Sequence, residues 1–183
     1  MPIFKPVSKY PDAQLPTRKT RYSAGYDMYV AEDTLIPPYC ELDSQLANYI
    51  VDAENSLDAL DNPVTLDEIA SITKTCDCRP TLVSTGVKCY LEEGQYLELT
   101  MRSSAPLKHW LIMGNSVGII DADYADNIGN EGEIFFQIIN LSPVPIILKK
   151  GDAIGQGIIK TYNITDDDTA IGDRVGGFGS TNV

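Results

Sequence analysis

The chain has 183 residues, and its 43% hydrophobic content is ordinary for one folded domain with a sizeable core. No apolar run approaches the roughly 18 residues of a membrane span, and Met1–Pro6 lacks the apolar stretch of a signal peptide. We therefore expect a cytoplasmic protein without a membrane partner. The formal net charge of −12 excludes a global basic field, and with it a role in coating nucleic acid.

The first predicted element is an acidic, helical segment at about residues 39–80. Its first half carries apolar residues at the spacing of one helix face: Leu42, Leu46, Tyr49 and Ile50. In its second half, Thr65 and Glu68 form a capping box that predicts a helix to about Lys74. The segment is too short for a large core of its own, so we interpret it as an insertion into a larger domain.

After this insertion the chain is predicted to be a series of short strands. Five segments alternate apolar and polar residues or are rich in Ile, Phe and Tyr: 81–91, 95–101, 133–141, 144–148 and 153–162. Turn-forming residues separate them, as in Glu92–Gly94 and Leu141–Pro143. This pattern predicts a single all-β domain over residues 1–183, a sandwich or barrel, and argues against a Rossmann fold.

The chain ends in a Gly-rich segment, residues 172–183, that cannot build a core. Three glycines surround Phe178, Arg174 precedes them, and Ser180 and Thr181 follow. Ordering such a segment is entropically costly, so we expect a mobile arm that becomes ordered when a ligand binds. A stacking face, a guanidinium and hydroxyls suit a nucleotide with phosphates.

The four cysteines are expected to be thiols. Cys76 and Cys78 form a C-x-C pair, which would need Cys40 or the lone His109 to hold zinc, and we favour thiols over a metal site. We expect a structural or surface role for His109.

Five unusual strings occur in order along the chain: Ser23–Asp33, Met101–Ala105, Asn115–Tyr124, Gly151–Gln156 and the C-terminal arm. Together they resemble the five motifs of the homotrimeric dUTPase family, which hydrolyses dUTP to dUMP and pyrophosphate. The resemblance implies a distorted jelly-roll (β-clip) subunit and a homotrimer with shared active sites. The insertion has no counterpart in the usual family pattern, which makes a phage or viral member plausible, acting in the host cytoplasm.

Asp121 follows an apolar run, so we place it at the end of a strand, where its partly desolvated carboxylate can act as a general base. The resemblance makes Asp121 the aspartate that activates water. It also implies that the ring of Tyr124 packs under the deoxyribose and excludes a 2′-hydroxyl. Asn115, at the start of a hairpin-like stretch that includes Gly118, is implied to read the uracil edge together with neighbouring backbone groups.

The remaining implied site residues concern the phosphates. Contacts to the triphosphate are implied for Arg102, Ser103, Ser104, Gln156, Ser180 and Thr181. Arg174 would stabilise the charge of the transition state, and Phe178 would stack on uracil. Asp27 is implied to belong to the acidic environment near the metal. The expected cofactor is Mg²⁺, held mainly by triphosphate and water rather than by a protein ligand cluster.

Two departures from the family pattern stand out. The connection Ala125–Glu131 is longer than the family's, and the spacing from Arg174 to Phe178 is one residue shorter than in many members. Two alternatives stay open. One is a dCTP deaminase-type enzyme of the same fold, which would need a glutamate where this chain has Asp121. The other is a dUTPase-like regulatory protein that binds a protein partner through the insertion.

Overall fold

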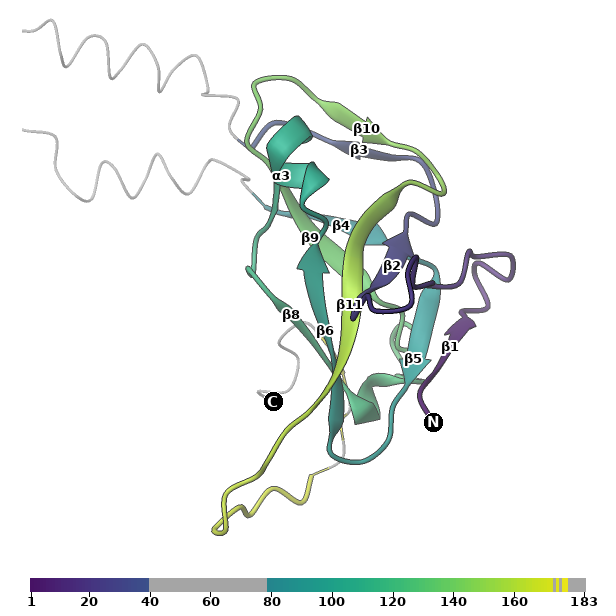
Figure 1. The fold of residues 1–183 in the computed structure, drawn as a ribbon, viewed down its shortest axis with the longest axis vertical. Helices are drawn as coiled ribbons and strands as arrows, with labels where there is room; N and C mark the ends of the chain where they lie inside the picture. The colour runs from purple at the N-terminus through teal and green to yellow at the C-terminus, as the bar shows by residue number, and fades with distance from the viewer. Residues whose placement is uncertain (40–78, 173, 175, 178–183) are drawn as a thin grey trace, which may run out of the picture.

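The computed structural model describes residues 1–39, 79–172, 174, 176 and 177. The predicted insertion lies almost entirely outside the described residues, as do Phe178, Ser180 and Thr181. The described part is built mainly of strands, which confirms the all-β prediction (Figure 1). The strands are β1 (Ile3–Pro6), β2 (Tyr26–Tyr29), β3 (Thr34–Ile36), β4 (Thr81–Ser84), β5 (Val87–Tyr90), β6 (Gln95–Met101), β7 (Leu111–Met113), β8 (Gly118–Asp121), β9 (Phe135–Asn140), β10 (Ile146–Leu148) and β11 (Ala153–Thr161).

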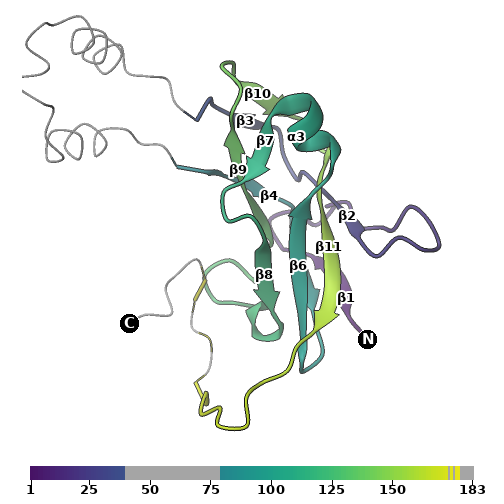
Figure 2. The same cartoon turned by 60° about the vertical axis from the view of Figure 1, so that its left-hand side comes forward.

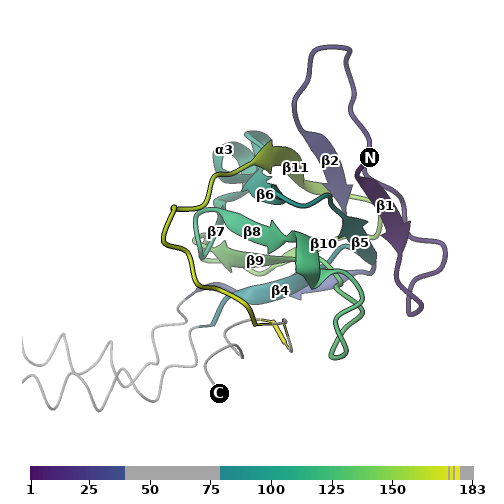
Figure 3. The ribbon, with the colours of Figure 1, turned by 90° about the horizontal axis from the view of Figure 1, so that it is seen from below.

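These strands form two larger sheets and two small ones. The four-stranded sheet has the order β2-β11-β6-β8, and the three-stranded sheet has the order β4-β9-β7. The pairs β1-β5 and β10-β3 complete the fold, and all pairings are antiparallel. Figures 2 and 3 show β4 and β9 stacked on β6, β11 and β2, so the two larger sheets cover one another.

The larger of two apolar clusters among the described residues fills the space between the larger sheets. Leu97 and Leu99 point into it from β6, and Phe136 and Ile138 point into it from β9. Because side chains alternate along a strand, the intervening residues of β9, which include Phe135 and Gln137, lie on the opposite face. This second face of β9 contributes to the site described below.

One prediction about the strands is wrong in detail. Residues 81–91 were expected to form one continuous strand, but β4 pairs with β9 whereas β5 pairs with β1. The break falls at Gly86, whose φ of +67° favours glycine. A Cβ there would lie 2.9 Å from side-chain carbons of Tyr10 and Ala13, so the backbone approaches its neighbours closely. Ser84, Thr85 and Gly86 interrupt the alternation of polarity at the break, a signal that the prediction of one strand overlooked.

Two short helical segments, which the sequence did not predict, lie beside the strands. Helix α3 (Ser104–His109) follows β6, and the 3₁₀ turn η2 (Ala122–Tyr124) follows β8. His109 ends α3 with an exposed side chain. A search of the described helices finds none with the length and apolar character needed to cross a bilayer.

Candidate active site

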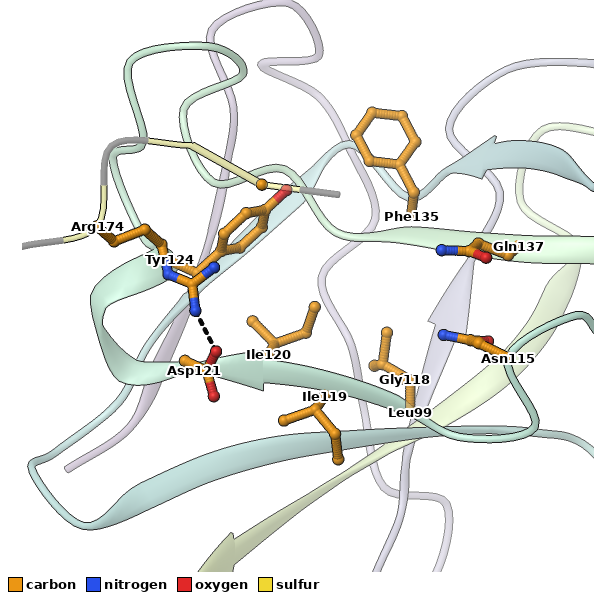
Figure 4. Close-up of a pocket in the computed structure, with 11 residues that line it drawn as sticks. Leu99, Asn115, Gly118, Ile119, Ile120, Asp121, Tyr124, Phe135, Gln137 and Arg174 are labelled. Carbon is orange, nitrogen blue, oxygen red and sulfur yellow. Dashed lines mark hydrogen bonds and ion pairs between the residues drawn. The ribbon is translucent and has the colours of Figure 1, made fainter. Parts of the chain in front are cut away.

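The residues after β7 and along β8 line a cavity of about 180 Å³. Asn115 lies at one end of this cavity and Asp121, at the end of β8, lies at the other (Figure 4). Tyr124, Gly118 and Arg174 also line it, so the cavity gathers five of the residues predicted from the sequence. Apolar groups of Leu99 and the β8 isoleucines Ile119 and Ile120 complete much of the wall.

The position of Asp121 confirms that it ends a strand. Its side chain is 48% exposed, so the carboxylate is partly desolvated while water can still reach it. Asn115 lies in the turn between β7 and β8, but these two strands pair with β9 and β6 respectively. The hairpin-like stretch expected there is therefore not a paired hairpin.

Tyr124 is buried, and the C-terminal arm covers its ring. A Cβ on Gly177 would lie 2.8 Å from a ring carbon of Tyr124, so only glycine lets the arm approach this closely. The guanidinium carbon of Arg174 lies 5.8 Å from the centre of the same ring. The arm and the tyrosine thus form one wall of the cavity.

Arg174 makes ion pairs with two carboxylates at this wall. Its Nε donates to Asp123 at 2.8 Å, and its Nη2 donates to Asp121 (Figure 4). Burial alone lowers the pKa of Arg174, but the hydrogen bond that Arg174 donates to Asp123 and the charges of both aspartates raise it overall. In the described chain Arg174 of the arm therefore compensates the negative charge of Asp121, the predicted base.

A second group of predicted residues lies at a different place. Asp27 on β2 is buried, and its Oδ1 accepts a hydrogen bond from Gln156 Nε2 at 3.0 Å on β11. Arg102 Nε lies 3.8 Å from the same oxygen. The second oxygen of Asp27, Oδ2, is buried without a hydrogen-bond partner among the described residues. Ser103 and Ser104 follow Arg102 at the start of α3.

These two groups are far apart within one chain. In the β6–β8 pairing, Tyr96 lies opposite Asp121, and Arg102 follows Tyr96 by six positions. At roughly 3.3 Å per residue, Arg102 lies about 20 Å from Asp121 along the sheet. Accordingly Arg102, Ser103, Ser104 and Gln156 line neither the cavity nor a second one of about 590 Å³ beside it.

Two residues of this cavity, Gln137 and Phe135, and one residue of the neighbouring cavity, Asp123, were not predicted as site residues. Gln137 and Phe135 reach the first cavity from the second face of β9, and Gln137 lies beside Asn115 (Figure 4). The signal that could have found Gln137 is a lone amide within a run of apolar residues. Asp123 was part of a quoted string but received no role, although it accepts the hydrogen bond from Arg174.

The sequence and the fold of this chain are both similar to those of known proteins. A protein of *Lactococcus lactis* named deoxyuridine 5'-triphosphate nucleotidohydrolase is 32% identical over 97% of this chain and 95% of its own length. The crystal structure of the dUTPase from *Streptococcus mutans* is 32% identical with a TM-score of 0.66, and the match covers 89% of this chain and 98% of that one.

A dUTPase from phage phi11 of *Staphylococcus aureus*, described with a species-specific insert, has a TM-score of 0.58 at 18% identity, over 98% of this chain and 99% of that one, and shares the fold. The two relatives at 32% identity are thus named as nucleotide hydrolases. The family model described as dUTPase matches residues 70–182, which is more than half of the chain. The chain therefore belongs to the dUTPase family.

Proposed function

We propose that this chain hydrolyses dUTP to dUMP and pyrophosphate, with water attacking the α-phosphorus. The observation that carries the proposal is the order of groups along the cavity, from Asn115 through Tyr124 to the carboxylate of Asp121. This order matches that of base, sugar and α-phosphate in the nucleotide. Asp121 would take a proton from the attacking water, the usual task of a half-exposed carboxylate acting as a general base.

The base would bind at the end of the cavity lined by Asn115 and Gln137. The two amides, which lie one beside the other at this end of the cavity, can match the donors and acceptors of uracil. Cytosine presents the opposite pattern at two positions, an acceptor at N3 and a donor at the 4-amino group, so buried polar groups would stay unpaired and binding would weaken. Phe135 and the apolar β8 side chains leave little room for the methyl group of thymine.

The sugar would lie against Tyr124, whose buried ring lines the same cavity. A 2′-hydroxyl needs space that a fixed ring does not give, so ribonucleotides would bind poorly. Phe178 would stack on the base from the arm, and Ser180 and Thr181 would cover the phosphates. These three residues lie outside the described residues, so their roles rest on the family resemblance.

Arg174 would exchange partners when the nucleotide binds. The triphosphate offers the guanidinium more negative charge than Asp121 and Asp123 do, and phosphate oxygens suit its fork of donors. Its departure would leave Asp121 free to accept a proton, and its arrival at the phosphates would stabilise the charge that develops there. The existing ion pairs of Arg174 support this exchange.

The other phosphate contacts would come from Arg102, Ser103, Ser104 and Gln156 of a neighbouring copy. A separation of about 20 Å along one sheet is too great for Arg102 and Asp121 of one chain to act on adjacent phosphates. This separation supports sites that are shared between copies, and the family resemblance implies that the assembly is a homotrimer.

The residues fit Mg²⁺ bound through the triphosphate. Asp27 is a buried carboxylate beside Arg102 and Gln156, and one of its oxygens has no hydrogen-bond partner within the described part of the chain. Such an oxygen can accept a hydrogen bond from water on a metal. When bound, the ion would neutralise charge on the triphosphate and on the leaving pyrophosphate. Gln156 and Arg102 would keep the Asp27 carboxylate oriented.

Pyrophosphate release from dUTP, dCTP, dTTP and UTP tests the proposal. We expect release from dUTP alone, because the base end discriminates against dCTP and dTTP and the sugar wall against UTP. Ammonia released from dCTP would instead indicate a deaminase of the same fold. Equal rates with all four nucleotides would contradict the assignment of the cavity to base and sugar.

A second role, binding of a protein partner through residues 39–80, stays a prediction because this segment lies outside the described residues. Its acidic composition supports the idea. Replacing residues 43–78 with a short Gly/Ser linker should then leave dUTP hydrolysis intact. Loss of the folded protein would show instead that the insertion belongs to the core or to the trimer interface. The cytoplasm stays the predicted location.

A further inference from the structure

The long connection after Tyr124 has no part in the reaction proposed above. Residues 125–132 form an irregular turn, and two of its residues, Asp126 and Glu131, adopt positive φ angles of 61° and 59°. Such conformations are unfavourable for residues with a side chain, and they persist where the surroundings hold them. This turn therefore needs anchors.

Two anchors tie the turn to the rest of the domain. The carboxylate of Asp126 accepts hydrogen bonds from Lys88 at 2.5 Å and from the hydroxyl of Tyr90 at 2.8 Å, both on β5. The carboxylate of Glu131 accepts a hydrogen bond from the backbone N–H of Ser8 at 3.1 Å. Both strained positions are thus held by contacts to distant parts of the chain.

Between these anchors, Asn130 reaches back to Tyr124. Its Nδ2 donates to the Tyr124 hydroxyl at 2.8 Å, and its Oδ1 accepts from the Gly132 N–H at 3.0 Å. The tyrosine hydroxyl in turn donates to the backbone carbonyl of Glu133 at 3.2 Å. The hydroxyl end of the ring is therefore held by two hydrogen bonds, while the ring itself lines the cavity.

We propose that Asn130 is a positioning residue for sugar selection: anchored by the turn, it fixes the ring of Tyr124 so that the ring cannot yield to a 2′-hydroxyl. This inference rests on the proposed role of Tyr124 against the sugar. Discrimination between dUTP and UTP then depends on how rigidly the ring is held as well as on its presence. The turn is an extension of the site's sugar wall.

The test is the ratio of kcat/KM for dUTP to kcat/KM for UTP. Asn130→Ala should lower this ratio roughly 3- to 10-fold, the range that the loss of one neutral hydrogen bond allows. Asn127→Ala is the matched control, because the Asn127 oxygen accepts a hydrogen bond from Gly129 within the turn. It removes a side-chain hydrogen bond of the same turn and keeps the backbone bond from the Asn127 N–H to the Tyr124 carbonyl, so its ratio should stay that of the parent protein.

Tyr124→Phe removes the same hydrogen bond from the other side and should lower the ratio at least as much. Asn130→Ala added to Tyr124→Phe should then have no further effect, because the bond is already absent. This second variant also keeps the test decisive if Asn130→Ala does not fold.

The outcomes separate this inference from the proposed function. If Tyr124→Ala leaves the ratio unchanged, the assignment of Tyr124 to the sugar is wrong. If Tyr124→Ala lowers the ratio but Asn130→Ala and Tyr124→Phe do not, only the positioning role of Asn130 is overturned. Equal losses in Asn130→Ala and Asn127→Ala would also overturn it, since the turn as a whole would then be responsible.

Discussion

Replacing Asp121 with asparagine should slow the reaction while tightening nucleotide binding. The substitution keeps the shape of the side chain and removes its ability to accept a proton. General base catalysis typically contributes about 10²- to 10⁴-fold, so we expect kcat to fall by at least about 100-fold. The same substitution removes one of the two ion pairs that hold Arg174 in the unliganded site.

The size of the binding effect follows from the exposure of this ion pair. The Asp121 side chain is 48% exposed and that of Arg174 is 20% exposed, so solvent screens their attraction. Partly exposed pairs contribute about 0.2–1 kcal/mol, which corresponds to at most about 5-fold in affinity. A non-hydrolysable dUTP analogue should therefore bind Asp121→Asn up to about 5-fold more tightly, with a smaller difference at high salt.

Single-turnover kinetics and calorimetric titration with the analogue and Mg²⁺ measure the two effects. Asp123→Asn is the matched control, since Asp123 also pairs with Arg174 but is not the proposed base. It should tighten binding to a similar extent and keep kcat within a few-fold of the parent protein. Near-normal turnover of Asp121→Asn would refute the base assignment, and weaker binding would refute the partner exchange of Arg174.

Three further predictions concern the assembly, a buried thiol and the anchored turn. The protein should sediment as a trimer. When the inactive variants Asp121→Asn and Arg102→Ala are refolded together, about one quarter of the shared sites should contain both native residues and regain activity. Persistent inactivity would contradict shared sites. Burial raises the pKa of Cys89 to about 12. Iodoacetamide at pH 8 should therefore modify this thiol rapidly only after the protein is unfolded in urea. Rapid modification of the native protein would contradict the burial of Cys89. The hydrogen bond from Lys88 lowers the pKa of Asp126 below its usual 3.8, so its contribution to stability is complete above about pH 4 and is lost as pH falls through the lowered value. Asp126→Asn should therefore cost at most about 1 kcal/mol at pH 6 and progressively less toward pH 2, as urea melts would show, whereas a cost independent of pH would contradict this coupling.

The strongly patterned strands were predictable from the sequence. Strand β6 has the predicted bounds of residues 95–101, because Leu97 and Leu99 alternate with polar residues and a Gly-containing turn precedes the strand. Asp121 was placed correctly at a strand end for a similar reason, since a polar residue there follows an apolar run. In both cases the local pattern and the tertiary packing demand the same structure.

Contacts between residues that are distant in sequence could not be predicted from the local pattern. The contact from Asn130 to Tyr124 depends on a turn held by Lys88 and Ser8, which are distant in sequence. Gln137 was overlooked because its strand was read for its buried face, whereas it lines the cavity from the opposite one. The contacts of both side chains are defined only by tertiary geometry.

The charge of the chain bears on how an acidic protein binds an anionic nucleotide. The charged side chains lining the two neighbouring cavities are Glu93, Asp121, Asp123 and Arg174, three carboxylates and one guanidinium. The net charge of −12 is screened beyond about 8 Å at physiological salt, so these local groups dominate. One chain alone would therefore repel a triphosphate at the position of its own base. A neighbouring copy that brings Arg102 to this place would reverse the local balance, so the proposed assembly would both complete the phosphate contacts and make binding electrostatically favourable.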